Sequence, residues 1–215
     1  MKLLLLIIFT GFSTSLFSQE KINFLTPPPS PEASFTQQLV NGEVTITYSR
    51  PMARGRKVFG GLVPFDSLWR TGASGATTIH LSEEIIMGNK VIKAGKYALF
   101  TIPGEKEWTI IINADTTLHG AFGYDMKKDI HRFNAKSEKS HTFSEAFTID
   151  LNELTRTGEG VLSLTWENTL VKIPLKSPGD EKVMAAINTR LINKRKQMPN
   201  SFTRRLTIIM QPVEI

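Results

Sequence analysis

Short alternations of apolar and polar residues are the feature that most restricts the fold of this chain. In VTITYS, Val44, Ile46 and Tyr48 share one face of an extended segment, and the residues between them share the other. A period of two predicts a β-strand with one buried face. Similar runs, rich in β-branched and aromatic residues, follow at short spacing: EIIM, KVI, KYALFTIP, EWTIIIN, EAFTIDL, GVLSLTWEN and LVKIPL. This pattern predicts an all-β fold, an antiparallel β-sandwich or jelly-roll-like domain.

Two residue pairs inside this region are typical of tight turns. Gly88–Asn89 lies between two apolar runs, and Asn168–Thr169 separates the last two predicted strands. Glycine and asparagine tolerate the positive φ angles that two-residue hairpin turns require. We therefore expect a β-hairpin at each position.

The helical period appears only near the C-terminus, in SPGDEKVMAAINTRLINKRKQ. Asp180 is expected to cap the helix, and basic residues gather at its far end, as the helix dipole favours. The apolar residues form one predicted stripe: Val183, Met184, Ile187, Leu191 and Ile192. We expect a C-terminal amphipathic helix that packs on the sandwich or on a partner protein.

The first residues, MKLLLLIIFTGFSTSLFSQ, follow the pattern of a secretory signal. Lys2 precedes a short apolar run, and small residues follow near Ser18. We expect a signal peptide over residues 1–18, a Pro-rich extended linker over 19–32, a β-sandwich domain over 33–176 and a helical, basic tail over 177–215. A retained N-terminal anchor is the alternative, although the apolar run is short for a membrane span. The expected location is periplasmic or extracellular.

The net charge of +6 is unevenly distributed. Residues 19–175 carry 17 basic and 17 acidic side chains, whereas residues 176–215 carry 8 basic and 3 acidic ones. The predicted domain is therefore neutral, and it lacks the basic surface that nucleic-acid binding requires. The chain has no cysteine, so stability must come from the core rather than from disulfides.

One segment, YSRPMARGRKVFGGLVPFDSLWRTGAS, is unusual for a protein core, because it combines arginines with glycines. Guanidinium groups suit carboxylates, phosphates and sulfates. We expect its candidate ligand-binding residues to gather at one end of the sandwich: Tyr48, Arg50, Arg54, Arg56, Trp69 and Arg70. The alternative is structural: Arg50, Arg56 and Arg70 pair with Asp66, Asp125 or Asp129 and with loop carbonyls.

Two further candidates are His119, in the Gly-rich stretch LHGAFGYD, and Asp129. They would serve as acid and base if the protein were an enzyme. No histidine shows metal-ligand spacing such as HxH or HExxH, and no GxSxG, phosphate-loop or dinucleotide motif occurs. The sequence therefore predicts neither a metal nor a cofactor, and it identifies no catalytic residue.

Five blocks of this sequence carry a resemblance to a known family: YSRP, GRKVFGGLVP, WRTGA, AGKYALFTIPG and GAFGYD. They resemble the signature blocks of a bacterial envelope family called domain of unknown function 2911, over roughly Ser30 to Leu175. The resemblance implies an exported, mostly β domain. It implies no known activity and supplies no catalytic residues.

These observations favour a non-enzymatic module of the bacterial envelope that binds a ligand, either an anionic small molecule or a glycan, or a partner protein. One alternative is an enzyme, such as a hydrolase acting on envelope carbohydrate, which needs titratable groups converging in a cleft. The other alternative is a purely structural domain, in which all the arginines are paired internally.

Overall fold

A computed structural model describes residues 27–40 and 42–196 of the chain. The predicted signal peptide, residues 1–18, lies outside the described residues. The strands are β1 (Glu32–Leu39), β2 (Gly42–Ser49), β3 (Thr77–Leu81), β4 (Ile85–Met87), β5 (Lys90–Ile92), β6 (Gly95–Ile102), β7 (Glu107–Asn113), β8 (Asp129–Asn152) and β9 (Glu159–Lys176). A 3₁₀ turn spans Met126–Lys128, and one helix, α1, spans Gly179–Lys196.

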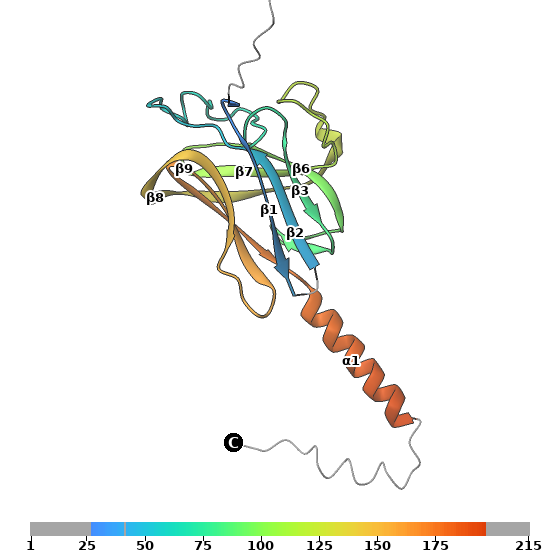
Figure 1. The fold of residues 1–215 in the computed structure, drawn as a ribbon. Helices are drawn as coiled ribbons and strands as arrows, with labels where there is room; N and C mark the ends of the chain where they lie inside the picture. The colour runs from blue at the N-terminus through green and yellow to red at the C-terminus, as the bar shows by residue number, and fades with distance from the viewer. Residues whose placement is uncertain (1–26, 41, 197–215) are drawn as a thin grey trace, which may run out of the picture.

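The strands form one antiparallel series in the order β1-β2-β3-β6-β7-β8-β9-β4-β5. The long strand β8 pairs with β7 through residues 129–136 and with β9 from Ser137 onward. The series bends along β8 and β9, as Figure 1 shows, so that the far part of β8 faces β2. Tyr48 of β2 and Phe147 of β8 meet edge to face, with ring centroids 5.9 Å apart. The predicted all-β, sandwich-like fold is therefore confirmed.

The core between the facing parts contains a group of aromatic side chains. Trp69 packs on Phe147 at 5.0 Å and on Trp166 at 5.9 Å between ring centroids, and Phe59 packs on Trp108 at 4.8 Å. Burying each large apolar side chain contributes about 1.5–3 kcal/mol. This group therefore stabilises the end of the sandwich at which residues 50–76 connect β2 to β3.

The hairpin prediction is right at one turn and wrong at the other. Met87 pairs with Lys90, so Gly88–Asn89 forms the β4–β5 turn as expected. Asn168–Thr169 forms no hairpin, because β9 continues through both residues to Lys176. Instead the β8–β9 ladder is irregular there, and Glu167 has a φ of 49°. Residues that favour a turn also permit a sharp bend within a strand.

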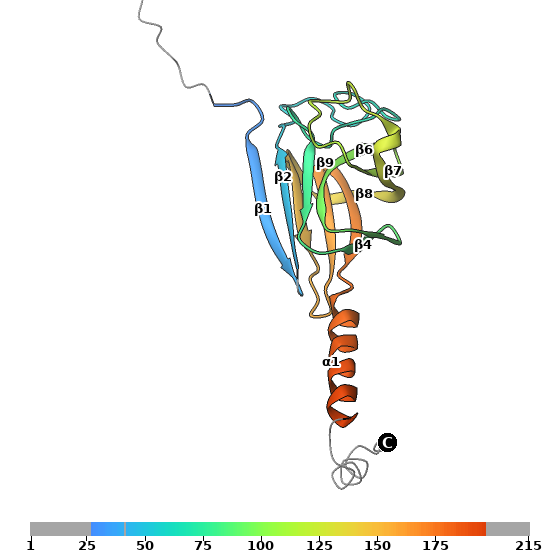
Figure 2. The same cartoon turned by 90° about the vertical axis from the view of Figure 1, so that its right-hand side faces the viewer.

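The C-terminal helix projects away from the sandwich (Figure 2). It begins at Gly179, whose amide donates to Ser177 Oγ. The side chain of Asp180, the predicted cap, lies outside the described part of the structure. Ile187, Leu191 and Ile192 are 44%, 50% and 53% exposed. These three members of the predicted stripe therefore do not pack on the sandwich, and packing on a partner protein stays a prediction. The side chains of the other two members, Val183 and Met184, lie outside the described part of the structure. In the described residues, no helix combines the length and the apolar character needed to cross a membrane.

Candidate functional site

The arginine-rich segment forms a long excursion between β2 and β3, at the end of the sandwich opposite α1 (Figure 1). Backbone hydrogen bonds fix it at intervals. The Trp69 amide donates to Thr101 O at 2.8 Å, and the Thr101 amide donates back at 2.9 Å. The Ala53 amide donates to Glu145 O at 2.8 Å. The segment is therefore an ordered part of the domain, fixed to β6 and β8.

Four residues other than glycine in this segment have a positive φ angle. They are Arg54 at 52°, Asp66 at 55°, Thr71 at 56° and Ser74 at 57°. A positive φ is particularly unfavourable for a β-branched residue such as Thr71. Such strained backbone is frequent where a binding or catalytic site depends on a specific loop shape. The concentration of strain here makes this end of the sandwich the first candidate for a site.

Three of the predicted arginines are bonded within the fold. Arg50 donates from Nε to Phe147 O at 3.2 Å and from Nη2 to Thr148 Oγ1 at 2.9 Å. Arg54 donates to Pro29 O at 2.9 Å. Arg56 donates to Ala53 O at 2.9 Å and to Met52 O at 2.8 Å. These guanidinium groups thus donate to backbone carbonyls and to one hydroxyl of the fold.

The acidic partners considered for these arginines take no part. Within the described part of the chain, none of the four arginines forms an ion pair with Asp66, Asp125 or Asp129. Asp129 instead binds Arg132. Of the arginines in the structural alternative, Arg56 therefore binds loop carbonyls as expected, whereas the expected carboxylate pairs do not form among the described residues.

Arg70 differs from the other three arginines. Its Nε is buried and has no hydrogen-bond partner among the described residues. Its head lies under the Gly-rich loop, because a Cβ placed on Gly120 would be 3.5 Å from Arg70 Nη1. A buried donor without a partner lowers stability by about 1–3 kcal/mol, and more when it is charged. Such a group in a folded protein requires an explanation.

A pocket of about 290 Å³ lies beside this residue. Arg56 and Arg70 contribute cations to its wall, and Trp69 and Trp166 contribute indole rings. The other lining residues are small or apolar: Ser30, Pro51, Leu62, Val63, Pro64, Ser67, Leu68, Gly72 and Ala73. The fold therefore brings together Arg56, Trp69 and Arg70 from the predicted set.

The remaining candidates from the arginine segment do not line this pocket. Tyr48 is buried, and its hydroxyl donates to Ile149 O at 3.2 Å while accepting from the Ile149 amide at 3.0 Å. Arg50 bonds to the two residues before Ile149 on β8. Tyr48 and Arg50 therefore hold the end of β2 against β8 and are not part of the pocket lining.

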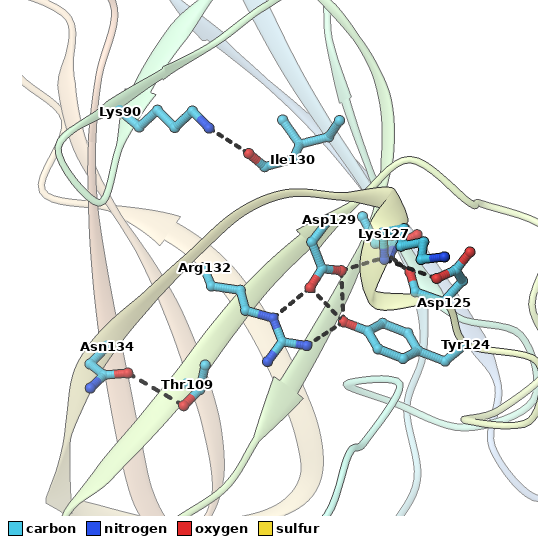
Figure 3. Close-up of polar contacts among 10 residues, drawn as sticks. Lys90, Thr109, Tyr124, Asp125, Lys127, Asp129, Ile130, Arg132 and Asn134 are labelled. Carbon is cyan, nitrogen blue, oxygen red and sulfur yellow. Dashed lines mark hydrogen bonds and ion pairs between the residues drawn. The ribbon is translucent and has the colours of Figure 1, made fainter.

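A second polar cluster connects the Gly-rich loop to the start of β8 (Figure 3). The Tyr124 hydroxyl lies 2.6 Å from Asp129 Oδ1, and Asn113 Nδ2 donates to the same oxygen at 2.7 Å. Arg132 donates from Nε to Asp129 Oδ2 and from Nη2 to the Tyr124 hydroxyl at 2.6 Å. Burial, together with the hydrogen bond to Asp129, raises the pKa of Tyr124 to about 12.

This cluster argues against an acid–base role for Asp129. Its carboxylate, 8% exposed, accepts from three side chains of the fold. His119 is exposed, lies near Gly75 and forms no hydrogen bond with a described residue. His119 and Asp129 are therefore not joined in one catalytic arrangement.

Arg132 and Asn113 are the members of this cluster that the sequence interpretation missed. Asp129 and Arg132 are three residues apart, a spacing that places side chains on opposite faces of a regular strand. The sequence therefore gave no signal for their contact. Among the described residues, no group of three or more His, Asp or Glu side chains is arranged to hold a metal ion.

Comparison with known proteins identifies a family but no activity. A family model described as a protein of unknown function, DUF2911, matches residues 30–175. No curated protein and no solved structure matches the chain. The match spans the whole of β1 to β8, most of β9 and every residue that lines the 290 Å³ pocket. The chain belongs to the DUF2911 family of proteins of unknown function.

Proposed function

We propose that this protein is a non-enzymatic binding module that holds a small anionic ligand in the 290 Å³ pocket. One observation carries the proposal: Arg70 lines the pocket, and its buried Nε has no hydrogen-bond partner among the described residues. A guanidinium group that makes no hydrogen bond within the fold is suited to donate to a bound carboxylate, phosphate or sulfate. Arg56, on the same wall, adds a second positive charge.

The pocket also limits the size and shape of the ligand. Its volume of about 290 Å³ lies just below the usual range for small-molecule sites, about 300–1,000 Å³. Trp69, Trp166, Leu62 and Val63 supply apolar surface next to the two arginines. The ligand is therefore a compact molecule that joins one anionic group to an apolar or ring-shaped part, such as a uronate or an aromatic carboxylate.

Ligand-dependent melting tests this proposal. The purified chain without residues 1–18 would be heated with glucuronate, benzoate, inorganic phosphate or sulfate, each compared with chloride at equal ionic strength. Binding to the native state raises Tm, because it adds about 2.7 kcal/mol to the free energy of unfolding when the free ligand concentration is one hundred times Kd. We expect glucuronate or benzoate, which join an anionic group to a ring, to raise Tm more than phosphate or sulfate does, and Arg70→Ala to abolish that rise.

Arg156→Ala is the matched control. It removes the same charge from an exposed position in the β8–β9 connection, outside the pocket lining. A shift retained by Arg70→Ala, or lost equally in Arg156→Ala, would contradict the assignment. So would the absence of any anion-specific shift.

We further propose that the module is exported to the bacterial envelope. The support is the charged start, apolar run and small residues of the first 18 positions. Cell fractionation with N-terminal sequencing tests this part separately. A periplasmic or extracellular chain that begins near Gln19 supports it, and a cytoplasmic chain that retains Met1 contradicts it.

A further inference from the structure

A second, larger hollow lies on another part of the molecule. It is an open groove of about 790 Å³ between the β4–β5 hairpin, β8, β9 and the connection from β8 to β9. Within the described residues, it shares no lining residue with the 290 Å³ pocket. Any ligand of the groove is therefore independent of the ligand proposed above.

The groove exists because two strands separate. β8 pairs with β9 from Ser137 onward, and before that it pairs with β7. β9 pairs with β4 at Leu175 and Lys176. In the described part of the chain, no ladder joins residues 133–136 of β8 to residues 172–174 of β9. The hollow between the diverging strands is therefore formed by the course of the backbone.

Apolar and aromatic side chains form part of the groove surface. Phe133 is fixed in place, because its ring stacks on His131 at 5.1 Å with 24° between the planes. The β4–β5 turn lies directly against this ring, since a Cβ on Gly88 would be 2.2 Å from it. The other apolar lining residues are Ile86, Ala135, Val161, Pro174 and Leu175.

Charged side chains on the groove walls are mostly paired with one another. Lys172 Nζ lies 2.7 Å from Glu153 Oε1, and Lys176 Nζ lies 3.8 Å from Glu159 Oε1. The remaining polar lining residues are Asn89, Asn134, Lys136 and Thr155. The groove therefore presents many hydrogen-bond donors and acceptors, with little net charge.

We propose that this groove binds a neutral oligosaccharide. Sugar hydroxyls both donate and accept hydrogen bonds, so they suit walls that alternate lysine, glutamate and amide groups. The apolar C–H face of a pyranose ring suits the half-buried or exposed apolar lining residues Ile86, Val161 and Pro174. A polyanion would need several unpaired cations, whereas Lys172 and Lys176 are paired with glutamates. A purely apolar ligand would leave the polar groups of the groove walls without hydrogen-bond partners. The volume lies within the range of small-molecule sites.

Calorimetric titration with neutral hexasaccharides tests this site. The probes are cellohexaose, maltohexaose, laminarihexaose and the hexamer of N-acetylglucosamine, with polygalacturonate as the anionic comparison. We expect at least one neutral probe to bind. In the double variant Lys136→Ala with Glu159→Gln we expect its affinity to fall at least about fivefold, because two hydrogen-bonding groups on the walls are removed.

Matched controls separate this groove from the rest of the surface. Lys139→Ala removes an exposed lysine from the same strand, and Glu105→Gln removes an exposed carboxylate, both outside the groove lining. Both controls should bind as the unmodified protein does. The proposal is overturned if no neutral probe binds, if polygalacturonate alone binds, or if the groove variant binds normally. Loss of binding in Arg70→Ala alone would place the sugar in the 290 Å³ pocket and would also overturn it.

Discussion

Asp129 and Arg132 bind each other through a carboxylate–guanidinium contact, although they lie three residues apart on one strand. A β-bulge explains the contact. Ile112 of β7 is opposite His131, but Asn113 is opposite Asp129, so Ile130 is an extra residue in β8. One inserted residue reverses the alternation of side chains. The bulge thus places Asp129 on the side of Arg132 and within reach of Tyr124 (Figure 3).

Removing the Asp129 carboxylate is expected to destabilise the protein. Asp129→Ala leaves Tyr124, Asn113 and Arg132 without their shared acceptor, at a cost of about 1–3 kcal/mol in unfolding free energy. Urea unfolding measures this change. Glu105→Ala, at an exposed loop position, should change stability by less than about 0.5 kcal/mol. Equal effects of the two substitutions would contradict the structural role of the cluster.

Tyr124 should ionise late in an alkaline titration. The pKa of its hydroxyl is raised to about 12, so the folded state favours the protonated phenol. This contribution to stability is complete below pH 10, the ordinary tyrosine value, and is lost as the pH rises toward 12. The difference in ultraviolet absorbance between the unmodified protein and Tyr124→Phe isolates the transition. A transition centred at pH 10 in the folded protein would show that the hydroxyl is not buried against Asp129.

The Asp115–Lys128 ion pair should affect stability in acid. Hydrogen bonds from Lys128 and then from Thr117 hold the pKa of Asp115 below its usual value of 3.8. A lowered pKa stabilises the folded protein above pH 3.8, and that contribution is lost as the pH falls further. Asp115→Asn should therefore weaken the dependence of Tm on pH between about 5 and 2. If Tm fell with pH in Asp115→Asn as steeply as in the unmodified protein, the contribution of this pair would be refuted.

Arg50 and Arg70 should respond differently to the same substitution. Arg50→Met loses the bonds to Phe147 O and Thr148 Oγ1 and should lower stability by about 1–3 kcal/mol. Arg70→Met removes a buried donor that has no partner among the described residues, so stability should be unchanged or slightly higher. Chemical denaturation of both variants tests the contrast. A large loss of stability in Arg70→Met would indicate a structural rather than a ligand-binding role.

Gly88→Ala should disturb the β4–β5 turn and the groove beside it. Gly88 has a φ of 56°, and a Cβ there would lie 2.2 Å from Phe133. Overpacking of this kind lowers stability by about 1–3 kcal/mol, and the positive φ adds to the loss. Thermal unfolding measures the effect. Substitution of Gly55, which also has a positive φ but no atom within 4 Å of a Cβ, separates the backbone contribution from the clash.

The local pattern of the sequence was sufficient for the strands and for one turn. The alternation in residues 44–48 places Val44, Ile46 and Tyr48 in the core, because side-chain direction in a strand depends only on position. Gly88–Asn89 forms the expected hairpin because its positive φ angles are a local property. Asn168–Thr169 forms no hairpin, because β9 pairs with β8 on both sides of these two residues and therefore continues through them.

The candidate site depended on contacts that no local pattern contains. The sequence singled out Arg50, Arg54, Arg56 and Arg70 together, but it could not distinguish the three that bind backbone or hydroxyl oxygens from the one that binds none among the described residues. That distinction depends on which carbonyls and loops from distant parts of the chain lie beside each guanidinium group. Residue type determined the chemistry available at this end of the sandwich, and tertiary packing decided which guanidinium group has a buried Nε without a partner among the described residues.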